Sequence, residues 1–238
     1  MKHSLKTAGT SWNSSKNLVP ELVSGRMYFS KVDLLPDKFN ENAFHLSDIL
    51  QIIRPQLSIH FNFMIDLEWL IEQYPAPCRD TPMVCVVGEK MGTDRRTLQS
   101  EVKASNLKNA TILGAALPLP FGTHHTKLSI FDCEDKVHVV VSTANLIEGD
   151  WSEKTQCFYY ACGSTANTSS SPSESKFAED LCAYLSEYRL QDVNFWIDRI
   201  RSCDFSGVSD RFSVLCAWLP SGQSARQVWS SVVGSTLT

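Results

Sequence analysis

The sequence predicts an α/β fold in which helices flank a mixed β-sheet, and three observations support it. Short apolar runs of strand length alternate along the chain with stretches of helical periodicity. Such alternation is typical of a sheet covered by helices. With 238 residues, of which 43% are hydrophobic and 20% charged, the chain can bury a full core. We therefore expect one α/β domain over residues 26–219.

The predicted elements follow from apolar periodicity and from turn residues. The strands are expected at 58–63, 82–88, 111–113, 128–131, 137–141 and 212–218. The helices are expected at 46–50, 66–73, 176–188 and 193–200. Ser47 is the expected cap of the first helix, and Pro75 ends the second. The Ser/Thr-rich stretch 163–175 predicts a mobile loop.

Both ends of the chain differ in composition from the predicted domain. Residues 1–25 are mostly polar and predict a flexible tail, whereas 220–238 predict a truncated or poorly structured segment. No apolar run approaches the length of a transmembrane helix, and the first residues lack the apolar region of a secretory signal. We therefore expect an intracellular protein without membrane association, in which the eight cysteines are reduced and mostly structural.

The residues that indicate chemistry are His125 and Lys127. Residues two apart on an extended chain point to the same side, so both side chains would reach one cleft while Thr126 turns away. A neutral imidazole is a competent nucleophile at phosphorus. A lysine ammonium can neutralise phosphate oxygens. This pair therefore predicts half of a site that cleaves a phosphate diester, because no other histidine has a lysine two residues later.

Asn145 and Gln156 complete the predicted constellation. A hairpin of strands 128–131 and 137–141 through an acidic turn would return Asn145 to the end where His125 starts. The Asn145 amide could then donate to phosphate, and Gln156 could accept from the far ring nitrogen of His125. A single His-x-Lys pair also occurs by chance. Asn145 capping a turn and Gln156 lying on the surface therefore remain open alternatives.

The charge distribution is compatible with nucleic acid only locally. The net charge is −4, but residues 79–127 carry more basic than acidic side chains. Four of these basic residues, Arg95, Arg96, Lys103 and Lys108, come shortly before the motif. They can form either a solvated face or a basic strip directed at the site.

Three linked segments resemble the tyrosyl-DNA phosphodiesterase family of the phospholipase D superfamily. The first active-site motif of the family is similar to Leu119–Lys127, and Ser142–Gln156 resembles the next motif. Further likeness covers Phe61–Leu70 before these motifs, and Phe177–Leu181 and Trp196–Ile200 after them. Together the resemblance spans roughly residues 40 to 218. It implies a phospholipase D-like α/β fold and corresponds to one of the two halves from which the family builds its site.

The resemblance also implies roles for individual residues. His125 would be the nucleophile that forms a phosphohistidine, Lys127 and Asn145 would bind phosphate oxygens, and Gln156 would support His125. Phe121 would pack against a nucleotide at the DNA end, with backbone contacts from Gly122 and Thr123. Neither a metal nor another cofactor is implied. Asp132, where the wider superfamily often has its motif aspartate, is interpreted as a solvated turn residue.

By this resemblance the chain would act in DNA repair in the nucleus. It would hydrolyse 3′-phosphotyrosyl and related adducts at single-stranded or nicked DNA 3′ ends, including covalently attached topoisomerase I peptide. The second histidine–lysine motif of the family is absent, so we expect weak activity or none from this chain alone. Two alternatives remain open: a homodimeric phosphodiesterase or nuclease, and a non-catalytic fragment that binds DNA ends.

Overall fold

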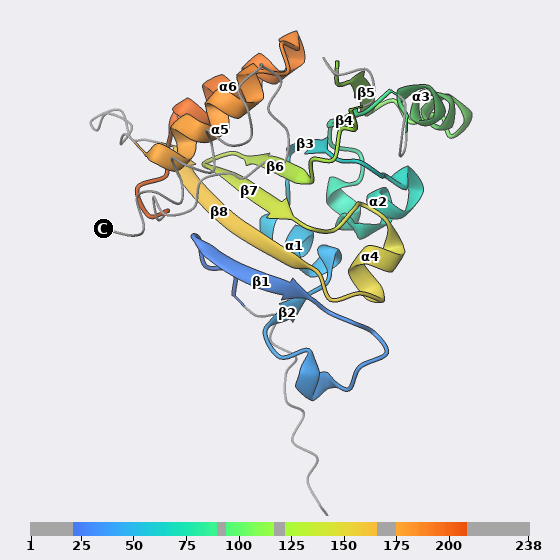
Figure 1. The fold of residues 1–238 in the computed structure, drawn as a ribbon, viewed down its shortest axis with the longest axis vertical. Helices are drawn as coiled ribbons and strands as arrows, with labels where there is room; N and C mark the ends of the chain where they lie inside the picture. Colours follow the sequence, from blue (N-terminus) through green and yellow to red (C-terminus); the bar gives the residue numbers. More distant parts are fainter. Residues whose placement is uncertain (1–20, 90–93, 117–121, 166–174, 209–238) are drawn as a thin grey trace, which may run out of the picture.

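A mixed sheet of nine strands forms the centre of the fold in the computed structural model, which describes residues 21–89, 94–116, 122–165 and 175–208 (Figure 1). The strands are β1 (Arg26–Ser30), β2 (Ala43–Phe44), β3 (Leu57–Phe61), β4 (Met83–Val87), β5 (Ala110–Gly114), β6 (Leu128–Cys133), β7 (Lys136–Ser142), β8 (Cys157–Thr165) and β9 (Cys203–Asp204). The α-helices are α1 (Leu46–Ile53), α2 (Leu67–Gln73), α3 (Arg95–Ala104), α4 (Glu148–Ser152), α5 (Lys176–Ser186) and α6 (Gln191–Arg201). Two short 3₁₀ helices lie at Asp37–Phe39 and Ala76–Cys78.

The sheet combines an antiparallel part with a parallel part. Its order is β2-β1-β8-β7-β6-β3-β4-β5, with β9 paired to the far end of β8. Strands β6, β7 and β8 run antiparallel in succession, whereas β3, β4 and β5 run parallel. The antiparallel pairing of β3 with β6 joins the two parts. The end of β3, the start of β6, the end of β7 and the start of β8 therefore lie at one edge of the sheet.

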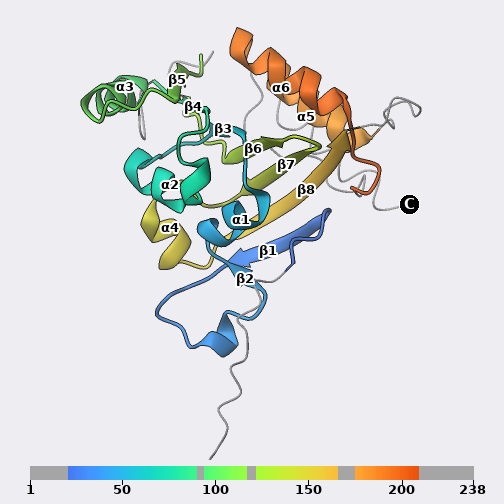
Figure 2. The same ribbon diagram turned by 180° about the vertical axis from the view of Figure 1, so that it is seen from behind.

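Helices cover both faces of the sheet (Figures 1 and 2). One buried cluster joins α1, α2 and α4 to one face, and a second joins α5 and α6 to the other. Alternation along the strands explains this division, since Val139 belongs to the second cluster while its neighbour Val140 belongs to the first. Buried apolar residues on both faces are what a sheet between two helical layers requires.

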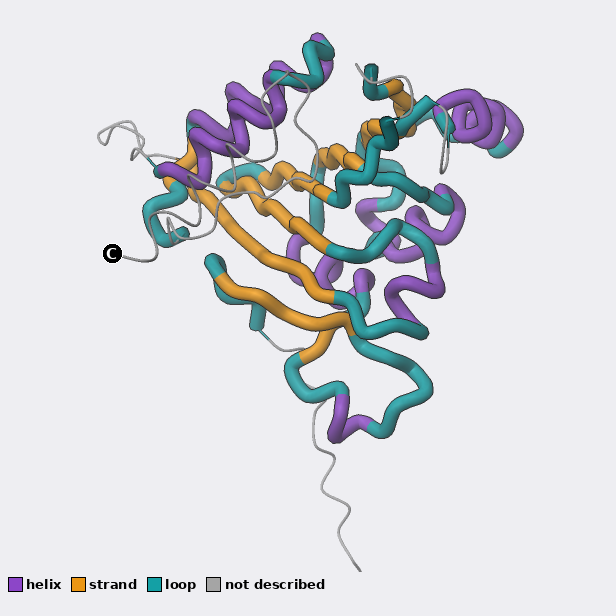
Figure 3. Tube along the Cα trace, in the orientation of Figure 1, coloured by secondary structure: helices purple, strands orange, loops and turns teal. Residues whose placement is uncertain are grey.

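Most of the predicted elements are confirmed. The hairpin of β6 and β7 is antiparallel and pairs Leu128 with Val141, as expected. Helix α2 begins after Asp66, whose side chain accepts from the Trp69 N–H, and it ends before Pro75. Helices α5 and α6 and strands β3, β4 and β5 match their predicted positions within a few residues. Figure 3 shows the strands (orange) side by side, with helices (purple) packed around them. The predicted strand 212–218 and the segment 220–238 lie outside the described residues.

Three predictions need correction or restriction. The N-cap of α1 is His45 rather than Ser47, and the His45 N–H donates to Asp48 Oδ2 over 3.0 Å. Gly163–Thr165, expected in a loop, belong to β8 because they pair with β7 and β9. Of the predicted tail, residues 1–20 lie outside the described residues. Ser24, near its end, is bound to β8, since its Oγ accepts from the Cys162 N–H over 2.8 Å.

The Asp132 interpretation is also wrong. Asp132 lies in β6, and its Oδ1 accepts from Arg199 Nε of α6 over 2.8 Å. Five residues of extended chain separate it from Lys127, which corresponds to roughly 16 Å. It therefore links a strand to a helix at the end of β6 away from the motif.

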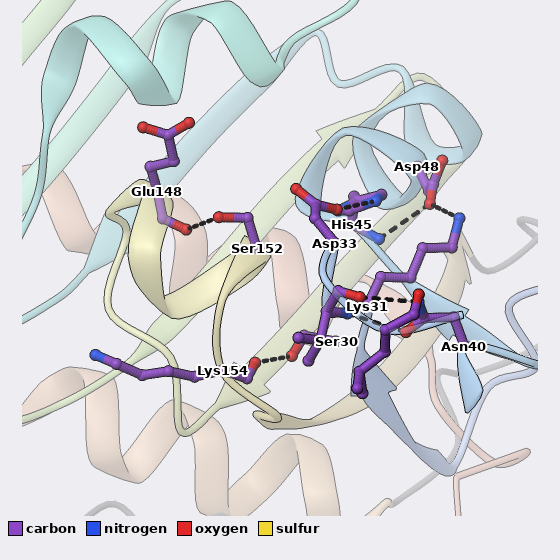
Figure 4. A network of polar contacts seen from close by, with 11 residues as sticks. Ser30, Lys31, Asp33, Asn40, His45, Asp48, Glu148, Ser152 and Lys154 are labelled. Atoms are coloured by element: carbon purple, nitrogen blue, oxygen red, sulfur yellow. Dashed lines mark hydrogen bonds and ion pairs between the residues drawn. The ribbon is translucent and has the colours of Figure 1, made fainter. Parts of the chain in front are cut away.

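A polar network fixes the loop that connects β1 and β2 (Figure 4). Lys31 Nζ contacts Asp48 Oδ2 of α1 over 2.8 Å, and the Asn40 side chain binds both the N–H and the carbonyl of Val32. Ser30, at the end of β1, donates its hydroxyl to the Lys154 carbonyl over 2.8 Å. Ser30 Oγ also accepts a hydrogen bond from the Gln156 N–H over 2.8 Å, so β1 positions the backbone at the predicted site residue Gln156.

Candidate active site

The sequence motif lies at the sheet edge where four strands meet. His125 and Lys127 directly precede β6, and Asn145 follows β7 by three residues. Gln156 immediately precedes β8, and Phe63 follows β3 by two residues. The Ser142 N–H donates to the Lys127 carbonyl over 2.9 Å, which keeps the start of β6 beside the end of β7. The fold thus gathers the predicted residues at one edge, although they span 32 positions from 125 to 156 in the sequence.

His125 and Lys127 are in direct contact. Lys127 Nζ lies 3.1 Å from His125 Nδ1, and it also lies 3.4 Å from the His125 carbonyl. An ammonium has no acceptor, so Nδ1 is the acceptor and the ring proton resides on Nε2 in this arrangement. His125 is exposed, whereas Lys127 is only 9% exposed. The pair therefore presents a solvent-accessible imidazole above a largely buried cation.

Burial and proximity shift the pKa values of both groups. Desolvation, followed by the Lys127 charge, lowers the pKa of His125 below its ordinary value of 6.5. Desolvation also lowers the pKa of Lys127, and the negative charge of Asp150 acts against this shift. The His125 imidazole is consequently neutral at neutral pH, which is the state in which it can act as a nucleophile.

Phe63 packs against both members of the pair. Its ring centroid lies 4.8 Å from that of His125, and Lys127 Nζ lies 5.7 Å from its centroid. Contact with an aromatic face restrains the imidazole and favours the nearby cation. Sequence reasoning did not identify Phe63 as a site residue, because alternation only made it the last residue of the predicted strand 58–63 and gave no indication of which residues it contacts.

Asn145 is held by Asp150 of α4. Asp150 Oδ2 accepts from both the backbone N–H and the side-chain Nδ2 of Asn145, each over 2.8 Å. Asp150 Oδ1 accepts from Lys154 Nζ over 2.7 Å. Burial tends to raise the pKa of Asp150, but the bonds from Lys154 and Asn145 prevail and hold that pKa below its ordinary value. An ionised, 4% exposed carboxylate thus orients the amide and supplies negative charge near Lys127.

Asp150 was missed by the sequence prediction, although the signal was available. An acidic residue in the first turn of a short helix, five positions after a candidate asparagine, can accept from that asparagine. The Oδ1 of Asn145 is buried without a hydrogen-bond partner. One end of the amide is therefore fixed while its oxygen remains available.

Gln156 is oriented by neighbouring residues rather than by a direct contact with His125. Its Oε1 accepts a short hydrogen bond from the Thr143 hydroxyl. Thr143 in turn accepts from the Cys157 N–H over 3.0 Å. The structure thus brings Gln156 to the same edge as Asn145, with its amide oxygen engaged by the β7–β8 connection.

The remaining predicted site residues lie at the entrance to β6. Gly122 and Thr123 are half-buried and precede the motif in a stretch without helix or strand. Phe121, the predicted nucleotide contact, lies outside the described residues. Within the described ranges, no group of three or more His, Cys, Asp or Glu side chains is arranged to hold a metal ion. No helix in those ranges is long and apolar enough to cross a membrane.

A cavity of about 770 Å³ lies next to this edge, between α2 and α3. Its apolar lining includes Met64, Ile65 and Ile147, which adjoin the site residues Phe63 and Asn145 in the sequence. Carboxylates also line it: Asp66, Glu68, Glu72, Asp94 and Glu101. This side of α3 is therefore acidic. Of the four basic residues for which a solvated face and a strip directed at the site were both left open, Arg95 pairs with Glu89 over 3.1 Å.

Comparison with known proteins identifies the family of the chain. The protein-family model described as "Tyrosyl-DNA phosphodiesterase" matches residues 26–230. The chain belongs to the tyrosyl-DNA phosphodiesterase family. It is 43% identical over 202 residues to a probable tyrosyl-DNA phosphodiesterase of Caenorhabditis elegans, covering 84% of this chain and 43% of that relative. It is also 34% identical over 159 residues to tyrosyl-DNA phosphodiesterase 1 of Drosophila melanogaster, covering 64% of this chain and 26% of that relative.

The fold agrees with this family. The crystal structure of yeast tyrosyl-DNA phosphodiesterase superimposes with a TM-score of 0.57 at 21% sequence identity, covering 76% of this chain and 42% of the yeast chain. The chain therefore spans less than half the length of these relatives. The predicted family and the predicted fold class, a mixed sheet flanked by helices, are both confirmed.

Proposed function

We propose that this chain provides the nucleophilic half of a DNA repair phosphodiesterase. Its substrates would be 3′-phosphotyrosyl and related adducts at single-stranded or nicked DNA ends, including peptide left by topoisomerase I. The observation that supports this proposal most strongly is the contact between the exposed, neutral His125 and Lys127, at the sheet edge that also holds Asn145. Family membership over residues 26–230 supports it independently.

The proposed reaction begins when phosphate enters the site. Its anionic oxygens are better acceptors for Lys127 Nζ than a neutral imidazole is, so the ammonium would leave His125 Nδ1. The ring proton can then move to Nδ1 through solvent, which frees the Nε2 lone pair. Gln156 would accept from the Nδ1 proton after a side-chain rotation away from Thr143. Lys127 and the second N–H of the Asn145 Nδ2 group, whose first N–H donates to Asp150, would together hold the non-bridging oxygens.

Bond making and breaking then follow in two steps. His125 Nε2 attacks phosphorus, a P–N bond forms, and the P–O bond to tyrosine breaks with the electron pair leaving on the phenolate. The phenolate takes a proton from solvent, and with an ordinary pKa near 10 it is a better leaving group than an alkoxide. Water next attacks phosphorus and gives its proton to solvent, the P–N bond breaks with its electron pair returning to Nε2, and the neutral imidazole is restored with a 3′-phosphate as product. Asp132 takes no part in either step.

The decisive experiment is capture of the covalent intermediate. A 5′-labelled oligonucleotide with a 3′-phosphotyrosine would be incubated with the chain in chelator, over a range of protein concentrations, and analysed for an acid-labile adduct. His125→Ala is expected to abolish the adduct. His45→Gln is the matched control, because His45 contacts Asp33 rather than the motif. Absence of any adduct with the wild-type chain would contradict the proposal.

The concentration series also tests the second arrangement. A single histidine–lysine pair is what a two-fold symmetric enzyme would contribute from each copy. Turnover that rises with the square of concentration would favour a homodimer that completes the site. Adduct formation proportional to concentration, without turnover, would indicate that a second half supplies the general acid. Binding without adduct would favour a non-catalytic role at DNA ends.

We further propose a nuclear location, which follows from a DNA substrate. Fractionation of cells that express the tagged chain at native levels would test it, with His125→Ala as a control that the location does not depend on activity.

A further inference from the structure

We propose that Tyr184 and Tyr188 are positioning residues that hold the His125–Lys127 motif from behind, an inference that rests on the proposed function. Tyr184 lies in α5 and Tyr188 lies two residues after this helix. Their hydroxyls reach the two motif residues whose side chains point away from the site, His124 and Thr126. Neither tyrosine is needed for contact with substrate.

The contacts form a connected chain. Thr126 Oγ1 lies 2.6 Å from the Tyr184 hydroxyl, which lies 2.7 Å from the Tyr188 hydroxyl. The Tyr188 hydroxyl lies 2.8 Å from His124 Nε2, and 3.3 Å from Thr126 Oγ1. His124 is 1% exposed, Thr126 4% and Tyr188 6%. Tyr184 is half-buried. The polar atoms of the three buried residues are thus largely shielded from water, and in such surroundings hydrogen bonds are strong and an unmade one is costly.

The hydroxyl protons of this network can all be donated in one direction, from Thr126 toward His124. Burial lowers the pKa of His124 to about 4, with the Asn62 backbone acting in the opposite sense, so its imidazole is neutral. If Nε2 carries the lone pair, Tyr188 donates to His124, Tyr184 donates to Tyr188, and Thr126 donates to Tyr184. Three hydroxyl protons thereby satisfy the three shortest contacts. Ring packing adds to this order, since the Tyr188 ring lies 4.7 Å from Phe61 and 5.6 Å from His124.

The motif needs such support because regular pairing with β7 starts only at Leu128, apart from the Ser142 N–H, which donates to the Lys127 carbonyl over 2.9 Å. Residues 122–127 belong to no helix or strand and precede Leu128, the first residue of β6. Hydrogen bonds to two alternate side chains hold one side of the segment in place. They therefore also fix the direction in which the side chains of the residues between and after them point. His124 and Thr126 are the anchored pair, and His125 and Lys127 are the pair so directed. The 3.1 Å contact of the catalytic pair therefore depends on hydroxyls that lie on the opposite side.

A second histidine–tyrosine pair in the same protein provides the matched control. His138 Nδ1 lies 2.7 Å from the Tyr160 hydroxyl, in β7 and β8. His138 is 8% exposed, and burial lowers its pKa to about 4, as for His124. Tyr160→Phe therefore removes the same kind of bond at comparable burial, without a contact to the motif. Thr126→Ser, which keeps the hydroxyl, controls Thr126→Val in the same way.

The first readout is independent of activity. NMR of the ring ¹⁵N and ¹³C nuclei in the 238-residue chain would give the tautomer and the pKa of His125. We expect Tyr188→Phe and Thr126→Val to raise this pKa toward 6.5 and to mix the tautomers, because Lys127 no longer faces Nδ1 consistently. Tyr160→Phe and Thr126→Ser should leave both unchanged. An unaltered His125 signal in folded Tyr188→Phe and Thr126→Val would overturn the proposal.

The second readout is the rate of adduct formation with the 3′-phosphotyrosyl oligonucleotide. We expect Tyr188→Phe to reduce the rate at saturating oligonucleotide by roughly ten- to a hundredfold, with less than about a twofold change in affinity, since misplacement affects the reacting geometry most. An equal reduction by Tyr160→Phe would mean that stability alone is responsible and would also overturn it. If the wild-type chain forms no adduct, the proposed function fails, while the NMR comparison still decides the positioning role.

Discussion

His124 and His125 are neighbours in the sequence but lie in opposite environments. His124 is 1% exposed and bound to Tyr188, whereas His125 is exposed and bound to Lys127. Burial lowers the pKa of both, to about 4 for His124. The difference arises because successive side chains of an extended chain point to opposite sides. One side chain therefore anchors the segment while the next is available for chemistry.

Substituting each histidine in turn should separate these two roles. Of all the predictions, this one has the largest expected effect. His125→Ala should reduce adduct formation by at least about 10³-fold, since the nucleophile is lost. Its free energy of unfolding should change by less than about 0.5 kcal/mol, as for other exposed positions. His124→Ala should instead lower stability by about 2–4 kcal/mol, because it leaves a cavity and an orphaned hydroxyl. Urea unfolding and adduct capture measure the two effects, and equal behaviour of the two variants would contradict the comparison.

Asp150 extends the comparison to the far side of the site. Asp150→Asn should lower stability by about 2–3 kcal/mol, because Asn145 and Lys154 lose a buried, charged acceptor. The freed Asn145 should also weaken binding of a 3′-phosphate oligonucleotide, measured by calorimetry. Glu148→Gln is the control on the same helix, since only its backbone carbonyl is engaged, by Ser152. Unchanged phosphate affinity in Asp150→Asn would show that Asn145 does not need this anchor.

Acid should lower the stability of the fold through its buried histidines. Burial lowers the pKa of His60 to about 3 and those of His124 and His138 to about 4. The folded state therefore keeps them neutral, and their contribution is fully present above about pH 6.5 and is lost as pH falls toward those values. Each should cost about 1.4 kcal/mol per pH unit in that window. Urea midpoints at pH 7.5, 6.0 and 5.0 would measure this loss.

Substituting one of these residues sharpens the acid prediction. His138→Asn removes one titrating group distant from the motif, so the slope of stability against pH should fall by about 1.4 kcal/mol per unit. A slope identical to that of the wild-type chain would show that His138 does not titrate as its burial implies.

The smallest effect is expected at Asp132. Asp132→Ala should cost about 1 kcal/mol, because its partly buried bond to Arg199 is lost while Arg199 keeps contacts with Thr165 and the Cys133 carbonyl. Adduct formation should be unchanged. Damage as severe as that of His125→Ala would mean that Asp132 acts in catalysis despite its place at the other end of β6.

Sequence patterns predicted many of the strands and helices but missed others. Alternation was enough to place β3, short apolar runs placed β4, β6 and β7, and helical periodicity placed α5 and α6. Strand β8 was missed because Phe158, Tyr159 and Tyr160 are buried on both faces and show no alternation. Helix α3 was also missed: it buries only Leu98, so its sequence has little apolar periodicity to detect.

At the site, the residue types and their order can be read from the sequence alone. His125, Lys127, Asn145 and Gln156 were identified from spacing and family resemblance, and the hairpin of β6 and β7 followed from local pattern. The contacts that hold them became visible only in the folded chain: Asp150 against Asn145, Phe63 against His125, and Tyr188 behind His124. Those contacts join distant parts of the sequence. The segment before β6, for example, meets Tyr184 of α5 and Tyr188 just after it across 58 to 64 positions. Local periodicity reports which side of a segment is buried, whereas the partner that covers it is chosen by the packing of the whole chain.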